Sequence, residues 1–201
     1  DRLCEGNCVI EQAGHGTVTI GAVESHVTET AFENGWVKPP KPTRDIQQSI
    51  GIIGAGPAAL AAADVLRRKG YQIDIYDRYD RGGGLLVYGI PNFKLDKSIV
   101  SRRITLLEDA GVKIHYNTDI GQDISFQKIR DRHHAVLIAT GVYKARDIQV
   151  PGIGLRNIVP ALDFLIASNR KSLGESVPEF ENGTLNSSGK RVVVLGAGDT
   201  A

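Results

Sequence analysis

The stretch SIGIIGAGPAAL, residues 49–60, decides the fold of this chain. A short apolar run ends at Gly54, and Gly56 and Ala59 complete the spacing G-x-G-x-x-A, which leads a strand into a helix around a diphosphate. Gly54 permits the tight turn, Gly56 lets the backbone approach a phosphate, and Ala59 leaves room for the helix to pack on the strand. The start of that helix offers unpaired N–H groups and a positive dipole end to an anion.

Asp77 stands 21 residues beyond Gly56, at the end of the stretch YQIDIYD. A carboxylate at that place in a Rossmann unit accepts hydrogen bonds from a ribose diol. A glycine-rich turn without a ligand is the alternative reading of the glycines alone. Strand, turn, helix and acid together indicate a dinucleotide site.

From Ile50 onward, apolar strands alternate with amphipathic helices, which predicts an α/β fold with a parallel sheet covered by helices. Strands are expected at SIGIIG, YQIDIYD, VKIHY, AVLIATG and the β-branched run Val192–Leu195. Helices are expected at PAALAAADVLRRKG, DKSIVSRRITLLEDAG, 126–130 and ALDFLIASNR. Before them, Val23, Val27, Ala31 and Phe32 recur at helical spacing. The proline-rich stretch 36–45 predicts a linker.

The charges are nearly balanced, with 24 Lys and Arg residues against 23 Asp and Glu residues, so no net field favours nucleic acid or an anionic membrane. The longest apolar stretch is interrupted by glycines and a proline and falls short of the roughly 20 residues of a membrane span. We therefore expect a soluble, cytoplasmic protein. A chain of 201 residues that begins at Asp1 and contains no Met has its true start elsewhere, on this interpretation.

The stretch DRYDRGGGLLVYGIPNFKLDK, residues 77–97, follows the ribose-binding acid directly. Three consecutive glycines before apolar residues suggest backbone that lies close to a large flat cofactor, which favours a flavin over a nicotinamide. A merely flexible loop at Gly82–Gly84 remains the alternative.

Six stretches occur in the order CEGNC, TIGAVE, GIIGAGPAAL, GGLLVYGIPNFKLDK, LIATGVYKARD and KRVVVLGAGDTA. Together they resemble the small (beta) subunit family of bacterial NADPH-dependent glutamate synthase. This is a family of iron-sulfur flavoprotein reductases that includes the amino-terminal part of dihydropyrimidine dehydrogenase. The resemblance implies the end of a helical iron-sulfur domain at 1–35, a linker at 36–49, a Rossmann-like FAD domain at 50–189, and the start of a second Rossmann unit, for NADPH, at 190–201.

The resemblance also implies which residues bind FAD. Gly56 and Pro57 would hold the diphosphate and Asp77 the ribose, with Ile120 near the adenine. Gly84, Leu85 and Lys94 would approach the flavin, although Lys94 is equally compatible with a solvated surface lysine. The full expected FAD set is Gly54, Gly56, Pro57, Ala59, Asp77, Arg78, Gly84, Leu85, Lys94, Ile120, Thr140 and Gly141, and the expected NADPH set is Gly196, Ala197, Gly198, Asp199 and Thr200.

Cys4 and Cys8 are the only cysteines in the chain. Taken alone they are compatible with idle thiols or a disulfide, because a cluster normally needs four ligands. The resemblance implies that Cys4, Cys8 and Glu24 ligate one 4Fe-4S cluster, with the remaining cysteine before Asp1. None of the five histidines is assigned chemistry.

The resemblance implies an oxidoreductase that takes a hydride from NADPH onto FAD. Electrons would then pass through 4Fe-4S clusters to the large (alpha) subunit, which forms glutamate. No acid–base catalytic residue is predicted, and the chain by itself is expected to be a poor catalyst. A related reductase with another electron acceptor and a non-catalytic nucleotide-binding scaffold are the alternatives.

Overall fold

The computed structural model of the chain describes residues 3–142 and 148–196. Its contacts divide the chain into two compact units, Asp1–Pro40 and Lys41–Ala201. The described part of the first unit contains the helices α1 (Leu3–Gly6), α2 (Val9–Gln12) and α3 (Ile20–Glu33), the last of which lies where the apolar spacing predicts a helix. No helix within the described ranges is both long and apolar enough to span a bilayer.

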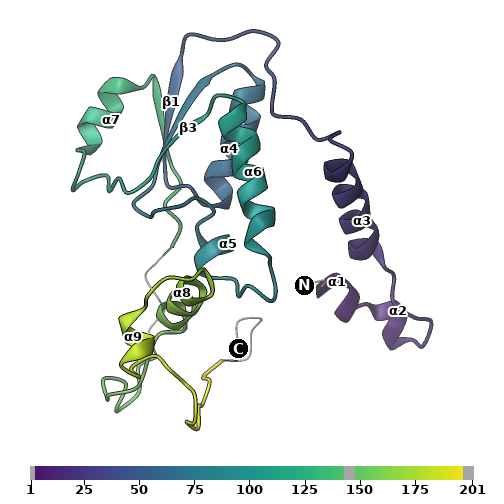
Figure 1. Cartoon of the computed structure of the whole chain (residues 1–201), viewed down its shortest axis with the longest axis vertical. Coiled ribbons are helices and arrows are strands. Elements are labelled where there is room, and N and C mark those ends of the chain that lie inside the picture. Colours follow the sequence, from purple (N-terminus) through teal and green to yellow (C-terminus); the bar gives the residue numbers. More distant parts are fainter. Residues whose placement is uncertain (1–2, 143–147, 197–201) are drawn as a thin grey trace. The chain divides into compact units, whose positions relative to one another are not determined.

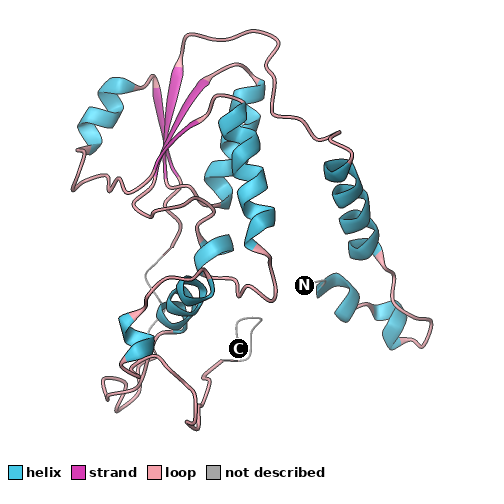
Figure 2. Cartoon of the chain, in the orientation of Figure 1, coloured by secondary structure: helices cyan, strands magenta, loops and turns pink. Residues whose placement is uncertain are grey.

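The second unit is built on a parallel sheet, which Figure 2 shows in magenta. Its strands are β1 (Ser49–Ile53), β2 (Gln72–Tyr76), β3 (Lys113–His115) and β4 (Ala135–Ile138), in the order β3-β2-β1-β4. The predicted parallel Rossmann-like sheet is confirmed. After β1, the chain adds β2 and β3 on one side of β1 and then β4 on the other side. The direction in which strands are added therefore reverses at β1.

Helices cover both faces of this sheet. α4 (Pro57–Arg68) connects β1 to β2, α6 (Lys97–Asp109) precedes β3, and α7 (Phe126–Arg132) precedes β4. α4 and α6 lie side by side on one face, and α7 lies on the other (Figure 1). Right-handed crossovers require this arrangement, because reversing the direction of strand addition moves the connecting helix to the opposite face.

The main core lies between the sheet and the α4 and α6 layer. Ile52, Ile73 and Ile75 point into it and are at most 2% exposed. Ala59 and Ala63 of α4 are fully buried against them. Since neither alanine extends beyond Cβ, α4 can lie close to the strands, as the predicted packing role of Ala59 requires.

A second apolar cluster joins the helices that follow the glycine run to those that follow β4. α5 (Leu85–Tyr88), α8 (Ala161–Ser172) and α9 (Pro178–Glu181) complete the described helices. Val87 and Tyr88 of α5 pack with Val100 and Ile104 of α6, and Ile166 of α8 lies against them. Residues distant in the sequence therefore support α5 from two sides.

The strand predicted at Val192–Leu195 is absent: residues 191–196 form no strand, and the four apolar side chains are 60–82% exposed. A β-branched run becomes a strand only when a partner satisfies its backbone groups, and none pairs with it in the part of the chain that the structure describes. The predicted NADPH residues Ala197, Gly198, Asp199 and Thr200 lie outside the described residues.

Replacing Ile52 with Ala removes a fully buried side chain from the centre of the sheet. We expect the free energy of unfolding to fall by about 2–5 kcal/mol, because the cavity adds to the lost transfer free energy. Urea unfolding of the purified protein measures this loss. Val65→Ala is the control, since Val65 is 52% exposed, and an equal loss in both variants would contradict the assigned core.

Candidate dinucleotide site

The turn after β1 is confined between the ends of two neighbouring strands. The N–H of Gly54 donates to the carbonyl of Tyr76 at the end of β2, at 2.7 Å. Gly54 has φ +100°, and a Cβ there would lie 2.4 Å from the carbonyl oxygen of Ala139, just beyond β4. Only glycine fits at this position. Because β2 and β4 lie on opposite sides of β1, the turn lies where the strand order reverses, and open α/β sheets bind ligands at such a point.

Gly56 is the N-cap of α4, and Pro57 occupies the first helical turn. A Cβ built on Gly56 would meet only the Cα of Gly84, at 4.0 Å, so the space in front of the helix is open. The first N–H groups of a helix have no intrahelical partner, and the dipole makes this end positive. An anion such as a diphosphate therefore fits here.

Asp77 follows β2 directly and is only 8% exposed. One carboxylate oxygen accepts the N–H of Ala55 at 2.5 Å, and the other accepts the N–H of Tyr79 at 2.8 Å. The side chain thus connects the turn after β1 to the turn after β2. A carboxylate has about four acceptor positions, so two remain for the hydroxyls of a ribose.

The glycine run packs directly against the first turn. The N–H of Gly83 donates to the carbonyl of Ala55 at 2.8 Å. A Cβ on Gly84, which has φ +52°, would lie 2.9 Å from the Cα of Gly56. The run is therefore a fixed backbone contact rather than the flexible loop that the sequence also allowed, and two glycine backbones meet beside the helix start.

The remaining predicted FAD residues lie after strands, in α5, or in the turn beyond α5. Arg78 follows Asp77, and its guanidinium carbon lies 5.1 Å from the centre of the Tyr79 ring. Leu85 begins α5 and is 42% exposed, and Lys94 lies in the turn beyond it. Ile120 bridges to Ile124 after β3, and Thr140 and Gly141 follow β4.

The first unit contains the predicted cluster ligands. Cys4 belongs to α1, Cys8 is the N-cap of α2, and Glu24 lies on α3. N–H groups of Val18 and then of Glu11 and Ile10 lower the pKa of the Cys8 thiol, which favours the thiolate that ligates iron. Within residues 3–142 and 148–196, no group of three or more His, Cys, Asp or Glu side chains is arranged to hold a metal ion, so this structure does not assemble the predicted ligand set.

A family model described as pyridine nucleotide-disulphide oxidoreductase matches residues 48–201. The chain belongs to this family. The resemblance predicted from the sequence is also confirmed: the glutamate synthase (NADPH) small chain of Azospirillum brasilense is 64% identical over 201 residues. That match covers 100% of this chain and 42% of the relative.

Other relatives of this chain carry different names. The putative oxidoreductase AegA of Escherichia coli is 41% identical over 100% of this chain and 30% of its own length. Among solved structures, Mycobacterium tuberculosis FprA in complex with NADPH matches with a TM-score of 0.54 and 23% identity, covering 64% of this chain and 29% of that one, which supports the fold alone. The chain spans less than half the length of these relatives.

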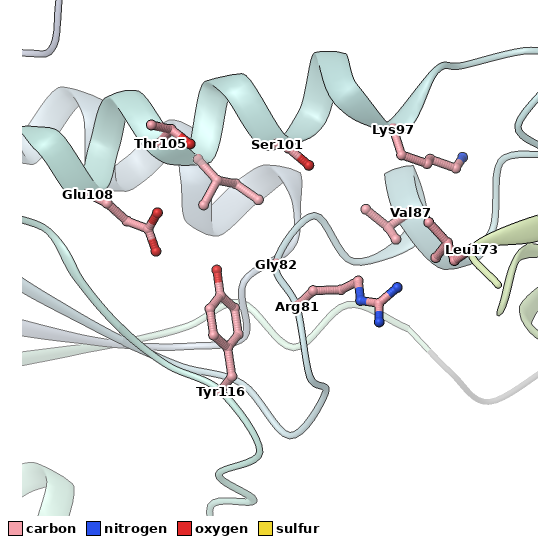
Figure 3. A pocket seen from close by; sticks show the side chains of 10 residues that line it. Arg81, Gly82, Val87, Lys97, Ser101, Thr105, Glu108, Tyr116 and Leu173 are labelled. Atoms are coloured by element: carbon pink, nitrogen blue, oxygen red, sulfur yellow. The ribbon is translucent and has the colours of Figure 1, made fainter. Parts of the chain in front are cut away.

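A separate cavity of about 450 Å³ lies between α6 and the turn after β2. Figure 3 shows the hydroxyl of Tyr116 pointing toward α6, with Glu108 and Thr105 on the same side. Burial, and then the charge of Glu108, raise the pKa of Tyr116. None of the residues predicted for FAD lines this cavity, so the dinucleotide edge and the cavity are different places.

A polar cluster that sequence reasoning missed lies on the sheet face opposite the main core. His133 Nε2 is 3.0 Å from the Tyr76 hydroxyl, and His133 Nδ1 is 3.2 Å from Ser49 Oγ. His115 stacks on the Tyr76 ring and lies 2.8 Å from an Asp74 carboxylate oxygen. These residues come from β1, β2, β3 and the end of α7, and only the alternation of polar with apolar residues in β2 indicated any of them.

Gly84→Ala tests the contact between the two glycine backbones. The added Cβ would sit 2.9 Å from the Cα of Gly56 in a backbone conformation reserved for glycine. We expect the dissociation constant of FAD to rise by about tenfold or more, as measured by titrating the flavin-free full-length protein. Gly154→Ala, in open space, is the control, and unchanged FAD affinity in Gly84→Ala would contradict the site.

Burial lowers the pKa of His133, although the Asp74 carboxylate opposes this shift. Near the ordinary histidine pKa of about 6.5, His133 therefore binds a proton more readily in the unfolded chain than in the folded one. Acidification consequently destabilises the fold. We expect His133→Gln to lose less unfolding free energy than the wild type between about pH 7.5 and about pH 5.5. Urea unfolding at both pH values measures the difference, with the exposed His26→Gln as the control. Equal losses in the wild type and His133→Gln would refute this assignment.

Proposed function

We propose that this chain is the FAD-binding part of the small subunit of an NADPH-dependent glutamate synthase. In this proposal the chain would hold FAD, which would supply the acceptance of a hydride from NADPH, and 4Fe-4S clusters would supply the path for electrons to a large subunit that forms glutamate from glutamine and 2-oxoglutarate. The observation that carries the proposal is the meeting of the Gly54–Gly56 turn, Asp77 and Gly84 at the carboxyl edge of the sheet. The proposal includes a cytoplasmic location.

The protein's own groups bind and orient the dinucleotide. The N–H groups at the start of α4 would receive the diphosphate through the open space at Gly56. Asp77, already fixed by two backbone N–H groups, would accept a ribose hydroxyl without further loss of side-chain freedom. Arg78 and Ile120 would lie along the adenosine half, with Thr140 and Gly141 beside the cofactor.

The flavin half would lie against the backbone of Gly84 and Leu85, with Lys94 near the ring. When bound, the flavin supplies the chemistry of accepting two electrons together and releasing them one at a time. The chain provides no acid or base for this step in our proposal. Its contribution is a rigid edge of the sheet, on which the close contact between Gly84 and Gly56 fixes one wall.

NADPH would bind to a unit that begins at residues 190–201. The spacing of Gly196, Gly198 and Ala201 supports this assignment. Ala197, Asp199 and Thr200 complete the proposed contacts. The names of the relatives at 64% and 62% identity favour NADPH over NADH.

Cys4, Cys8 and Glu24 are proposed as ligands of one 4Fe-4S cluster, together with a cysteine before Asp1. The N–H groups around the Cys8 sulfur support a thiolate there. Iron analysis of the full-length protein tests the ligand set. Loss of iron in Cys8→Ser, but not in Ser187→Ala, is expected, whereas a flavin-loaded wild type without iron would refute the cluster.

The decisive activity test mixes the full-length protein with NADPH and ferricyanide, which accepts single electrons. We expect NADPH oxidation, and we expect Asp77→Asn to lower FAD affinity by at least about tenfold, because an amide loses the charged acceptor facing Ala55. The exposed Asp163→Asn is the control. Absence of NADPH oxidation by the flavin-loaded wild type would favour the non-catalytic scaffold.

A related reductase with another electron acceptor is the second candidate, favoured by the 41% identity to a putative oxidoreductase. Purification from the native cell distinguishes the two. Recovery with a large subunit and glutamate formation from glutamine and 2-oxoglutarate supports the first candidate. Recovery with a different electron-accepting protein supports the second.

A further inference from the structure

The backbone of α5 and its exit turn is held by two side chains from other helices. α5 is a single turn, and Gly89 and Ile90 donate their N–H groups back to the carbonyl of Leu85 at 2.9 Å. The carbonyls at the end of a helix have no partner within it and must find other donors when buried. Here Leu86, Tyr88 and Ile90 receive theirs from outside α5.

Lys97 supplies two of these donors from the start of α6. Its ammonium donates to the carbonyl of Leu86 at 3.0 Å and to the carbonyl of Ile90. The residue is only 8% exposed, and burial lowers its pKa. Figure 3 shows it extending from the start of α6 above the turn that carries Val87. Burying an ammonium is costly, so packing alone does not account for a lysine here.

Asn169 supplies the third donor from α8. Its side-chain amide donates to the carbonyl of Tyr88 at 3.0 Å and to the carbonyl of Leu165, also at 3.0 Å. The residue is 2% exposed and lies 81 positions beyond Tyr88 in the sequence. Because both Lys97 and Asn169 bond to main-chain oxygens, they fix the path of the backbone whatever side chains α5 carries.

We infer that Lys97 and Asn169 are positioning residues that set the backbone of residues 84–90 against the flavin. This inference rests on the proposed function. Gly84 and Leu85, at the start of the held segment, are the residues proposed to lie along the flavin, and Gly84 contacts the turn at Gly56. A shift of α5 would move this wall of the site directly. Neither residue touches the cofactor in this role.

Lys97→Met and Asn169→Asp in the full-length protein test the inference. Methionine keeps the bulk of lysine without a donor, and aspartate keeps the shape of asparagine while turning an acceptor toward two carbonyls. We expect the dissociation constant of FAD to rise by about tenfold in each variant, with a changed visible absorption band of the bound flavin. The KM for NADPH should stay within about twofold of the wild type, because that site lies elsewhere in our proposal.

The matched controls are Lys128→Met, at an exposed position of α7, and Asn182→Asp. Asn182 uses its side-chain oxygen to accept the N–H of Thr184, and aspartate preserves that bond. Circular dichroism checks folding. Lys97→Gln and Asn169→Ser, which keep a donor, replace any variant that fails to fold, and a smaller shift in the same direction is expected from them.

The outcomes distinguish a failure of the proposed function from a failure of the positioning role. A wild-type protein that binds no flavin would overturn the proposed function itself. Wild-type flavin binding with folded variants that keep its affinity and absorption band would overturn the positioning role alone. A lower melting temperature without a change in flavin affinity or spectrum would mark Lys97 and Asn169 as merely structural, and would likewise overturn it.

Discussion

The bond between the Asp77 carboxylate and the N–H of Ala55 holds the candidate site together. It spans two loops that belong to different strands, at a distance of 2.5 Å, with the carboxylate almost wholly removed from water. A second N–H, from Tyr79, satisfies the other oxygen. With the two strand-end turns fixed in this way, Gly83 can bond to Ala55 and bring the glycine run beside the start of α4. Each later contact of the site depends on that geometry.

The local patterns in the sequence were sufficient for the elements of the sheet. Period-two alternation in YQIDIYD and the apolar run before Gly54 correspond to β2 and β1, and the helices at 97–109 and 161–172 follow their predicted positions. Asp77 was expected to face a ribose, but its bonds to backbone N–H groups were not expected. Sequence spacing shows which residue ends a strand and does not show which neighbouring turn it meets.

The features that the sequence could not predict are contacts between distant polar groups. Asn169 and Tyr88 are 81 positions apart, and His133 and Tyr76 are 57 apart, so no short-range periodicity relates them. At Val192–Leu195 the prediction was wrong in the opposite sense: the residues favour a strand, and the structure contains none there. In both cases the deciding factor is a partner elsewhere in the fold, which local propensity does not contain.

The three glycines of the run, Gly82, Gly83 and Gly84, differ in what would have to change for evolution to replace each of them with a larger residue. A methyl group at Gly82 would meet the flexible end of Ile104 at 3.0 Å, so a smaller residue at 104 compensates. At Gly83 it would meet Val87 and Val100 at 2.6 and 2.8 Å, and the φ of +112° disfavours any other residue even if both side chains were smaller. At Gly84 it would meet the Cα of Gly56, and because glycine has no side chain, no second substitution at Gly56 can make room. A compensated replacement is therefore open to this run at Gly82 and closed by the backbone conformation at Gly83 and Gly84.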